Sequence, residues 1–511
     1  MALLVDQLRW MAEHVGDEVA YTDLATGQTL TFAEWDAASN RMGRYLSQGG
    51  PAASVAPGER VLLHLESEHL FRWIISYAAI HKAGGVVVPT NVRLTARELA
   101  AILAHAQPVA AVTSTALLPV VAEATAGQAR LRFTISADDD GGRLSGGWRP
   151  TQANDGSPFQ VPVDDGDLAD IMYTSGTTGL PKGIAVRHRN THVVPNGQPR
   201  WTGQAWIHSA PLSTFAGISF VYNPMKMGMT ALYLPRFDCD RWFDAVEQHR
   251  PTCAFLVPAT AQLLVTHDRW PIADLSSLTL LSIGSAPLAP TLHKAMADRL
   301  PTTMVTNNYS MTEAGTAFTY MPPGGLDAHP GSVGIPMPPT EIRIADEHGE
   351  PMPPGEVGEV LIKVGEDHRE YYDDPEATAR TWSGSWLRSG DIGTLDAEGY
   401  LTIVGRSKDV IIRGGNNIAA TEVENALYEH PGVLEAAVVG VPHDVLGEDV
   451  GAYVVPRPGV VLTAEEVQAF CAERLADYKR PRHVWFLDEL PRNATGKVVK
   501  RDLVVPSPPP G

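Results

Sequence analysis

The sequence predicts an α/β protein of two or more domains. Its 511 residues exceed the ~250–300 residues at which a single hydrophobic core stops growing. Helix and strand signals alternate over most of the length, which favours helices layered on largely parallel sheets. Near residues 340 and 405 the pattern changes, and each change indicates a further structural unit.

The first half of the chain gives the clearest signals for individual elements. Thr31 and Glu34 have the spacing of a capping box, which predicts a helix that reaches about Gly49. A strand, a helix and a second, buried strand are then expected at residues 61–65, 71–83 and 85–89. A loop rich in Asp, Gly and Ser is expected over residues 137–165.

From Thr340 the sequence is typical of short strands and turns, with strands expected at residues 341–345, 359–363 and 401–404. This pattern predicts a small β subdomain that closes a large N-terminal domain of residues 1–405.

Residues 406–505 are expected to form a small α+β domain of their own. Capping boxes at Thr421–Glu424 and Thr463–Glu466 predict two helices, the first ending near His430. Strands are expected between them at residues 436–441 and 450–455. The Pro-rich residues 506–511 carry no apolar pattern, so we expect a disordered tail.

The composition excludes several classes of protein. With 40 basic and 59 acidic residues the formal net charge is −19, which argues against nonspecific binding to nucleic acid or to anionic membranes. The three cysteines, Cys239, Cys253 and Cys471, are widely separated and suggest buried reduced thiols rather than disulfides or a metal cluster. Neither a signal-peptide pattern nor a membrane span is recognisable, so a cytoplasmic protein is expected.

The most informative segment runs from Thr174 to Gly183 and follows an apolar stretch. Its small residues can turn backbone N–H groups toward an anion, its hydroxyls add donors, and Lys182 adds positive charge. We interpret it as a loop that binds a polyphosphate. The spacing differs from that of a P-loop, so that fold does not follow. A flexible linker is the alternative, but linkers seldom lie between two apolar runs.

Four further segments carry candidate chemistry, and each has an ordinary structural explanation as well. Residues 307–313 offer a ring for base stacking, hydroxyls and a carboxylate, or else the start of a capped helix. Asp391 could bind a ribose diol, or could belong to a simple Gly-Asp turn. Residues 405–417 combine charge with glycine, as a hinge or a solvated linker would. Lys497 follows a glycine near the C-terminus, where a surface lysine is common.

Together these motifs resemble the adenylate-forming superfamily, which comprises acyl- and aryl-CoA ligases, luciferases and the adenylation domains of peptide synthetases. The resemblance extends from about Thr31 to Leu503 and is nearest in type to an acyl-CoA ligase. It implies the adenylate-forming fold, in which a small mobile C-terminal domain sits on a large N-terminal domain.

The resemblance also implies ATP, Mg²⁺ and, as co-substrate, CoA. The implied catalytic residues are Lys497, Thr312, Glu313 and Lys182, with Glu313 as the metal ligand. The implied nucleotide-binding residues are Thr174, Ser175, Gly176, Thr177, Thr178, Gly179, Lys182, Gly284, Ser285, Ala286, Asn308, Tyr309, Thr312, Asp391 and Arg406.

The implied reaction has two halves. A carboxylate attacks the α-phosphate of ATP to give an acyl-adenylate and pyrophosphate, and a nucleophile such as the CoA thiol then displaces AMP. Lys497 matches the lysine of the first half, and Lys408 matches the hinge about which the C-terminal domain swings for the second.

Two residues depart from the pattern common among CoA ligases. Thr214 stands where histidine is frequent, and Ser310 replaces the glycine after the stacking tyrosine. Both changes leave the second half-reaction open, so an amine, a carrier-protein thiol or an inorganic nitrogen nucleophile is an alternative acceptor. A nucleotide-binding regulatory protein without catalysis is a third reading, but it would be expected to have lost Lys182, Glu313, Asp391 or Lys497.

The acyl substrate is expected to be an aromatic, alicyclic or medium-chain acid. Residues 212–222 contain no acidic side chain that could pair with an amino acid's ammonium group. The plausible lining residues are Phe215, Ile218, Phe220, Asn308 and Met311. Lys226 could pair with a second acidic group on the substrate, although a surface lysine is the simpler interpretation. The sequence leaves the oligomeric state open, with a homodimer as one option.

Overall fold

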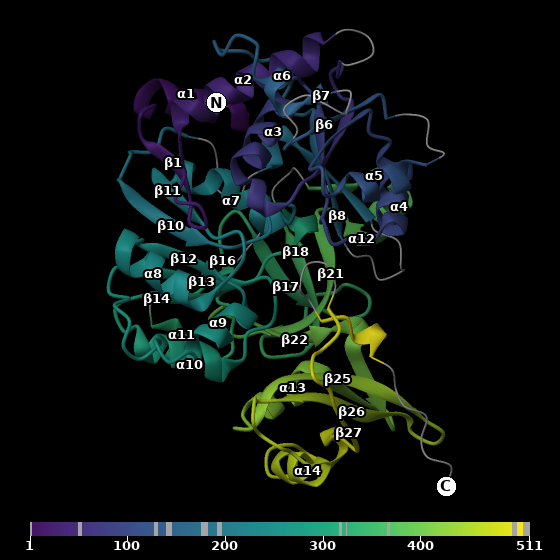
Figure 1. The fold of residues 1–511 in the computed structure, drawn as a ribbon. Helices are drawn as coiled ribbons and strands as arrows, with labels where there is room; N and C mark the ends of the chain where they lie inside the picture. Colours follow the sequence, from purple (N-terminus) through teal and green to yellow (C-terminus); the bar gives the residue numbers. More distant parts are fainter. Residues whose placement is uncertain are drawn as a thin grey trace.

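The structure is a computed structural model that describes residues 3–49, 54–126, 131–138, 146–174, 182–191, 197–315, 319–322, 324–364, 368–492 and 498–503. Figure 1 shows a large body that contains the elements from α1 to β22 and a smaller body below it. The smaller body contains α13, α14 and the strands β25 to β27. The tail expected at residues 506–511 lies outside the described residues.

The first sheet is built by alternating strands and helices. In spatial order its described strands are β14 (Met304–Asn308), β13 (Leu280–Gly284), β12 (Cys253–Leu256), β10 (Gln204–His208), β11 (Met229–Tyr233), β1 (Val19–Asp23) and β2 (Thr29–Thr31). Every neighbouring pair is parallel except β1 and β2. Helices α8 (Cys239–His249), α9 (Pro258–Val265) and α10 (Pro290–Arg299) share one apolar core with these strands. The predicted α/β layering is therefore confirmed here.

A second sheet carries the strands expected early in the chain. In spatial order its described strands are β19 (Glu370–Tyr371), β9 (Lys182–Arg187), β8 (Leu168–Thr174), β4 (Val86–Pro89), β3 (Arg60–His64), β5 (Ala110–Thr113), β6 (Phe133–Ser136) and β7 (Gly146–Gly147). The strands predicted at 61–65 and 85–89 correspond to β3 and β4, and the helix between them is α3 (Leu70–Lys82). Pairing is parallel except for β9, which is antiparallel to both β8 and β19.

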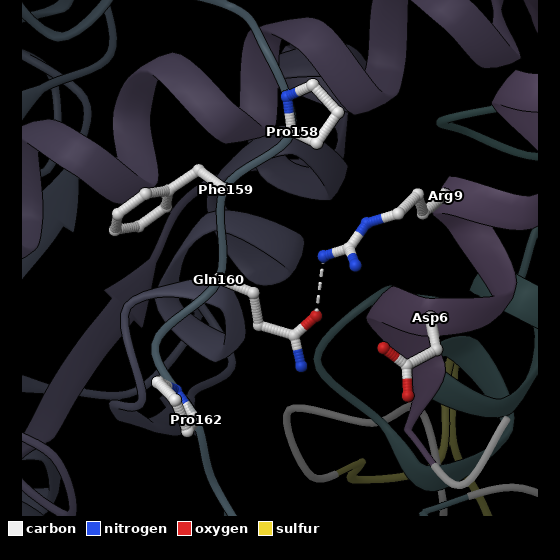
Figure 2. A pocket seen from close by; sticks show the side chains of 6 residues that line it. All are labelled: Asp6, Arg9, Pro158, Phe159, Gln160 and Pro162. Carbon is white, nitrogen blue, oxygen red and sulfur yellow. Dashed lines mark hydrogen bonds between the residues drawn. The ribbon is translucent and has the colours of Figure 1, made fainter.

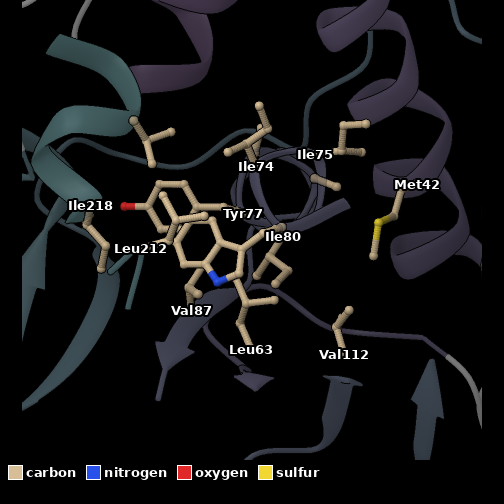
Figure 3. Close-up of a cluster of buried hydrophobic side chains, with 14 of the residues drawn as sticks. Met42, Leu63, Ile74, Ile75, Tyr77, Ile80, Val87, Val112, Leu212 and Ile218 are labelled. Atoms are coloured by element: carbon tan, nitrogen blue, oxygen red, sulfur yellow. The ribbon is translucent and has the colours of Figure 1, made fainter. Parts of the chain in front are cut away.

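Helix α7 (Phe215–Lys226) packs against the cores of both sheets. In Figure 3, Leu212 and Ile218 lie beside Tyr77 of α3, near the strand residues Leu63 and Val87. Further along α7, Phe220 packs on Trp206 and Phe255 of the first sheet. The helix is thereby held in a fixed position between the two sheets.

The third sheet confirms the β subdomain expected after Thr340. Its described strands are β17 (Glu341–Ala345), β18 (Gly358–Lys363), β21 (Trp386–Leu395) and β20 (Trp382–Ser383), with β22 (Leu401–Arg406) paired to β21. All of these pairs are antiparallel. A small ribbon of β15 (Thr319–Tyr320) and β16 (Ile335–Pro336) is separate from them.

The fourth sheet lies in the smaller body. Its described strands are β24 (Asn416–Ala419), β23 (Val410–Arg413), β26 (Gly447–Pro456) and β25 (Val433–His443), with β27 (His483–Phe486) paired to β26. The β25 and β26 strands contain the ranges expected at 436–441 and 450–455. Helices α13 (Ala420–Tyr428) and α14 (Ala464–Ala472) share its apolar core.

Two of the three predicted capping boxes are present. Thr31 caps α2 (Phe32–Gln48) together with Glu34, and Thr463 caps α14 together with Glu466. The box expected at Thr421–Glu424 is wrong, because α13 begins at Ala420, two residues earlier than a helix capped by Thr421 would, and has no side-chain cap. Its Glu424 instead accepts a hydrogen bond from the backbone N–H of Val438 at 2.8 Å.

The remaining α-helices of the described residues are α1 (Leu4–Val15), α4 (Ala96–Ala106), α5 (Leu118–Thr125), α6 (Trp148–Thr151), α11 (Gly325–Ala328) and α12 (Pro375–Thr381). Since α6 and β7 fall within residues 137–165, that segment is not the continuous loop that its composition predicts. No helix in the described part of the chain is long and apolar enough to cross a bilayer.

A buried ion pair between α2 and α3 gives a test of this packing. Lys82 is fully buried and its Nζ donates to Asp36 Oδ1 at 2.6 Å and to Asn40 Oδ1 at 2.7 Å. Burial lowers the pKa of Lys82 to about 8, and the neighbouring Asp36 opposes that shift.

We expect Lys82→Met to lower the free energy of unfolding by about 3–5 kcal/mol, because it leaves the Asp36 carboxylate buried without its cation. Urea denaturation measures the change, and the double variant Asp36→Leu/Lys82→Met should recover much of the loss. Lys294→Met, which breaks the exposed pair with Asp298, is the control and should leave the midpoint unchanged. A Lys82→Met protein as stable as the wild type would contradict the prediction.

Candidate active site

The segments predicted to bind adenine meet at the carboxyl ends of β13 and β14. Gly284 lies opposite Asn308 in this pair, and a Cβ at Gly284 would come within 3.2 Å of the Asn308 carbonyl oxygen. Ser285 follows with a φ of 71°, a conformation that is strained for a residue with a side chain. Ser285 and Ala286 are both exposed at this edge. In open α/β sheets, ligands bind outside the carboxyl ends of the strands.

Tyr309, Asp391 and Arg406 form a hydrogen-bonded group beside this edge. The Tyr309 hydroxyl donates to Asp391 Oδ2 at 2.5 Å, and Arg406 Nε lies 2.6 Å from Asp391 Oδ1. The Asp391 side chain is only 5% exposed, whereas Arg406 is 45% exposed. Burial, together with the charge of Asp391, raises the pKa of Tyr309 well above its usual value, so the phenol keeps its proton. The three residues come from the end of β14, from β21 and from β22, and the fold brings them together.

The backbone around Asp391 is held as firmly as its side chain. Its N–H donates to Ser389 Oγ at 3.0 Å, and that hydroxyl donates to the Val360 carbonyl oxygen at 2.6 Å. Asp391 lies within the strand β21 rather than in a turn, with Gly390 at a φ of 68° just before it. The carboxylate is therefore presented from a rigid strand of the third sheet.

The expected phosphate-binding loop connects the two strands of a hairpin. Thr174 at the end of β8 pairs with Lys182 at the start of β9. The predicted residues Ser175, Gly176, Thr177, Thr178 and Gly179 lie outside the described residues. The two described ends of the loop, Thr174 and Lys182, thus lie side by side on paired strands, and β9 in turn pairs with β19.

Tyr371 on β19 links the end of this loop to the expected metal ligand. Its ring lies under Lys182, with Nζ 5.0 Å from the ring centre, and its hydroxyl is 3.5 Å from Glu313 Oε1. Burial, with the Glu313 charge as the next cause, raises the pKa of Tyr371 to about 12. Lys182 and Glu313, far apart in sequence, are therefore connected through one aromatic ring.

Tyr371 and the neighbouring Arg369 are site residues that the sequence analysis missed. Arg369 Nη1 donates to the Thr312 carbonyl oxygen at 2.8 Å. Both residues lie in the run of charged and polar residues 366–373, which is typical of a solvated loop. The pairing of β19 with β9 brings Tyr371 into the site, and Arg369 lies just before β19 in the chain.

At the start of α7, Thr214, which stands where CoA ligases often have histidine, has a structural role. Thr214 Oγ1 accepts from the Gly217 N–H at 3.1 Å and donates to the Pro211 carbonyl oxygen at 2.7 Å, so it caps the helix. Ser310 is exposed. Of the lining residues that were expected, Ile218 belongs to the packed core, while Phe215, Phe220, Asn308 and Met311 are half-buried.

Lys226 is not a surface lysine, contrary to the simpler interpretation of the sequence. It is 6% exposed at the end of α7, and burial lowers its pKa to about 6. The sequence interpretation failed because the last turn of α7 is buried at Met225 and Lys226 rather than open to solvent.

The C-terminal candidates are placed only in part. Lys497 lies outside the described residues. Lys408 is exposed in a short 3₁₀ turn just after β22. Residues 413–417 form the tight turn between β23 and β24, with Gly414 and Gly415 at φ values of 57° and 83°.

A surface hollow elsewhere on the large body contains none of the predicted site residues. Figure 2 shows it between α1 and the segment around Phe159, with Arg9 Nη2 donating to Gln160 Oε1 at 2.8 Å. That bond and the adjacent packing fix the connecting segment onto the N-terminal helix. We assign the hollow no role in the chemistry.

Known proteins resemble the chain over nearly its full length. It is 37% identical over 495 residues to a feruloyl-CoA synthase of an Amycolatopsis species, covering 93% of this chain and 94% of the relative. The crystal structure of ATP-bound MatB from Rhodopseudomonas palustris superposes with a TM-score of 0.86, at 29% identity, over 98% of both chains. The amide bond synthetase McbA from Marinactinospora thermotolerans superposes with a TM-score of 0.84, also at 29% identity, over 98% of this chain and 99% of that one.

The Tyr309–Asp391–Arg406 group predicts a defect in nucleotide binding. Asp391→Asn should raise the KM for ATP by about 10- to 100-fold, because it removes a charged hydrogen-bond acceptor of the kind worth about 1.5–3 kcal/mol. Tyr309→Phe should raise the KM for ATP less, because it keeps the aromatic ring and removes only the hydroxyl. Steady-state kinetics or titration calorimetry with ATP measures the effect. The control is Glu359→Gln, which alters the Arg388–Glu359 pair on the same sheet. An unchanged KM in Asp391→Asn would exclude Asp391 from the nucleotide site.

Profiles of one family match both bodies of the structure. The AMP-binding enzyme profile matches residues 8–372, and the profile of the AMP-binding enzyme C-terminal domain matches residues 422–497. The first match covers β8, β9 and the segment with Tyr309 and Glu313, and the second reaches Lys497. The chain therefore belongs to the AMP-binding enzyme family, with the adenylate-forming fold.

Proposed function

We propose that the protein is an AMP-forming carboxylate–CoA ligase. The observation that carries the proposal is the contact of Asp391 with both Tyr309 and Arg406, together with the separate contacts of Tyr371 with Lys182 and Glu313. The first group suits the adenosine part of ATP and the second suits its phosphates. The CoA ligase among the similar proteins supports the same class of reaction.

In the first half-reaction an oxygen of the substrate carboxylate attacks the α-phosphorus of ATP. The bond between the α-phosphorus and the bridging oxygen breaks, and pyrophosphate leaves. Thr174 to Lys182 would hold the β- and γ-phosphates, and Thr312 the α-phosphate. Lys497 would lie between the carboxylate and the α-phosphate, where its charge stabilises the transition state.

The residues present fit a magnesium ion held partly by the nucleotide. Mg²⁺ usually takes one or two carboxylates plus substrate phosphates, and Glu313 supplies one carboxylate here. The described residues contain no cluster of three or more metal-ligating side chains, as a site built entirely by protein would require. When bound, the ion would neutralise charge on the phosphates.

In the second half-reaction the thiolate of CoA attacks the acyl carbonyl carbon, and AMP leaves. We propose that the C-terminal domain swings about Lys408 between the two steps, which withdraws Lys497 and brings residues 413–417 to the thiol side. The exposure of Lys408 and the tight glycine turn support this assignment.

The acyl substrate that we propose is an aromatic, alicyclic or medium-chain acid. Phe215 and Phe220 present half-buried aromatic surface on α7, and no carboxylate faces them from that helix. The similar protein named for feruloyl-CoA supports an aromatic acid. We place the enzyme in the cytoplasm, with small molecules rather than nucleic acid as its partners.

Amide formation is a second candidate function. The structural likeness to an amide bond synthetase favours it. In that case an amine attacks the same acyl-adenylate, and the first half-reaction is unchanged.

The acceptor is tested with a panel of aryl, alicyclic and aliphatic acids incubated with ATP, Mg²⁺ and either CoA or amines. We expect CoA thioesters of at least one aromatic acid, detected by mass spectrometry, and stoichiometric AMP. If amides form and no thioester is detected, the protein is an amide synthetase and not a CoA ligase. Absence of ATP–pyrophosphate exchange with every acid would contradict both.

The role of Lys497 is tested by separating the half-reactions. Lys497→Ala should slow pyrophosphate release by about 100-fold or more, as expected for loss of a group that stabilises the transition state. Thioester formation from supplied acyl-adenylate should be largely retained. Lys500→Ala, which breaks the neighbouring pair with Glu424, is the control and should affect neither half. Equal loss of both halves in Lys497→Ala would refute the assigned role.

A further inference from the structure

Arg369 is a buried guanidinium that ties together two turns near the site. It is 3% exposed, and it donates through Nη1 to the Thr312 carbonyl oxygen at 2.8 Å and through Nη2 to the Asn190 carbonyl oxygen at 2.5 Å. Thr312 opens a 3₁₀ turn of three residues, and Asn190 ends another. Such short turns have poor internal hydrogen bonds, so external contacts decide their geometry.

The arginine keeps its charge although it is buried. Burial lowers its pKa to about 10, and the charges of Asp170 and Glu313 oppose that shift. At neutral pH the guanidinium is therefore still protonated, with the expected metal ligand among its neighbours. Its Cζ also lies 5.0 Å from the centre of the Phe215 ring, at the start of α7.

The surroundings are shaped to admit this side chain. Gly315, just after the Thr312 turn, has a φ of 67°, and a Cβ there would come within 3.0 Å of Arg369 Nε. The backbone of Arg369 is fixed in turn, because Trp382 Nε1 donates to its carbonyl oxygen at 3.0 Å. The hydrogen bond from Trp382 on one side and the missing side chain at Gly315 on the other thus determine where the guanidinium lies.

We propose that Arg369 is a positioning residue for adenylation, which holds the Thr312–Glu313 turn in the geometry that faces the nucleotide phosphates. The proposal rests on the proposed function of that turn. Through Phe215 the same guanidinium sets the distance between this turn and the first residues of α7, where the acyl group is expected. Arg369 thereby fixes both reacting partners of the first half-reaction without contacting either.

The test compares Arg369→Met and Arg369→Lys with Arg299→Met. Arg299 is the matched control, since it also donates to two backbone carbonyls, those of Trp270 and Ala273, neither of which is a predicted site residue. Arg369→Met should slow ATP–pyrophosphate exchange by about 100-fold, the effect of misplacing reacting groups by about an ångström. The Mg²⁺ concentration for half-maximal rate should rise by roughly 10-fold, because a displaced Glu313 loses about 1.4 kcal/mol of ion binding.

A lysine cannot reach both carbonyls, so Arg369→Lys should have an intermediate rate, and added guanidinium should restore part of the rate of Arg369→Met. Arg299→Met should lower the melting temperature without changing the rate or the Mg²⁺ requirement. If Arg369→Met behaves like Arg299→Met, Arg369 only stabilises the fold and the proposal is overturned.

If Arg369→Met fails to fold, Arg369→Lys decides: an unchanged Mg²⁺ requirement in that variant overturns the proposal. If the wild type shows no exchange with any acid, the proposed function fails instead. Calorimetric titration with ATP and Mg²⁺ then still tests Arg369, with weaker binding expected in Arg369→Met and unchanged binding overturning the proposal.

Discussion

The candidate site depends on one buried carboxylate, that of Asp391. Its two oxygens are engaged by the Tyr309 hydroxyl and by Arg406, which come from the first sheet's last strand and from the strand that leaves the third sheet. An anion buried at this depth needs such partners, since its desolvation is otherwise too costly. The hydrogen bond from Tyr309 to Asp391 therefore also joins the first sheet to the third. A nucleotide that binds at Asp391 would enter a site whose side chains are already in place.

A second set of buried charges supports the phosphate side of the site. Asp170 on β8 accepts from the Tyr77 hydroxyl at 3.0 Å and lies 3.1 Å from His81 Nε2, while Arg369 adds its positive charge nearby. Asp170 itself belongs to β8, the strand that leads into the expected phosphate loop. Because each of these buried polar groups needs its neighbours, this part of the second sheet tolerates little movement.

Much of this structure follows from short-range signals. Thr31 and Thr463 cap their helices as predicted, because a capping box needs residues only three positions apart. The signal fails at Thr421, where Glu424 is used by the Val438 N–H and by Lys500. Contacts of the helix with β25 and with the C-terminal turn outweigh the local one there.

The residues of the candidate site also fall into those with a local sequence signal and those without one. Tyr309, Glu313 and Asp391 stand in motifs that the sequence displays, and the structure places Tyr309 and Asp391 in direct contact. Arg369 and Tyr371 carry no local signal, since their positions depend on β19 pairing with β9. For Lys226 the sequence favoured a surface position, whereas the side chain is buried. Nothing near it in the sequence shows that the end of α7 is covered.

The burial of Lys226 bears on whether a second acidic group of the substrate could pair with this lysine, as the sequence left open. Burial lowers the pKa of Lys226 to about 6, so its ammonium form is disfavoured relative to that of an exposed lysine. A dicarboxylic acid would therefore meet a hydrogen-bonding group rather than a permanent cation, and forming an ion pair would take up a proton from solution. If the substrate acid reaches Lys226, its second carboxylate pairs with this lysine only when a proton is taken up, so acceptance of a dicarboxylic acid increases as the medium becomes more acidic.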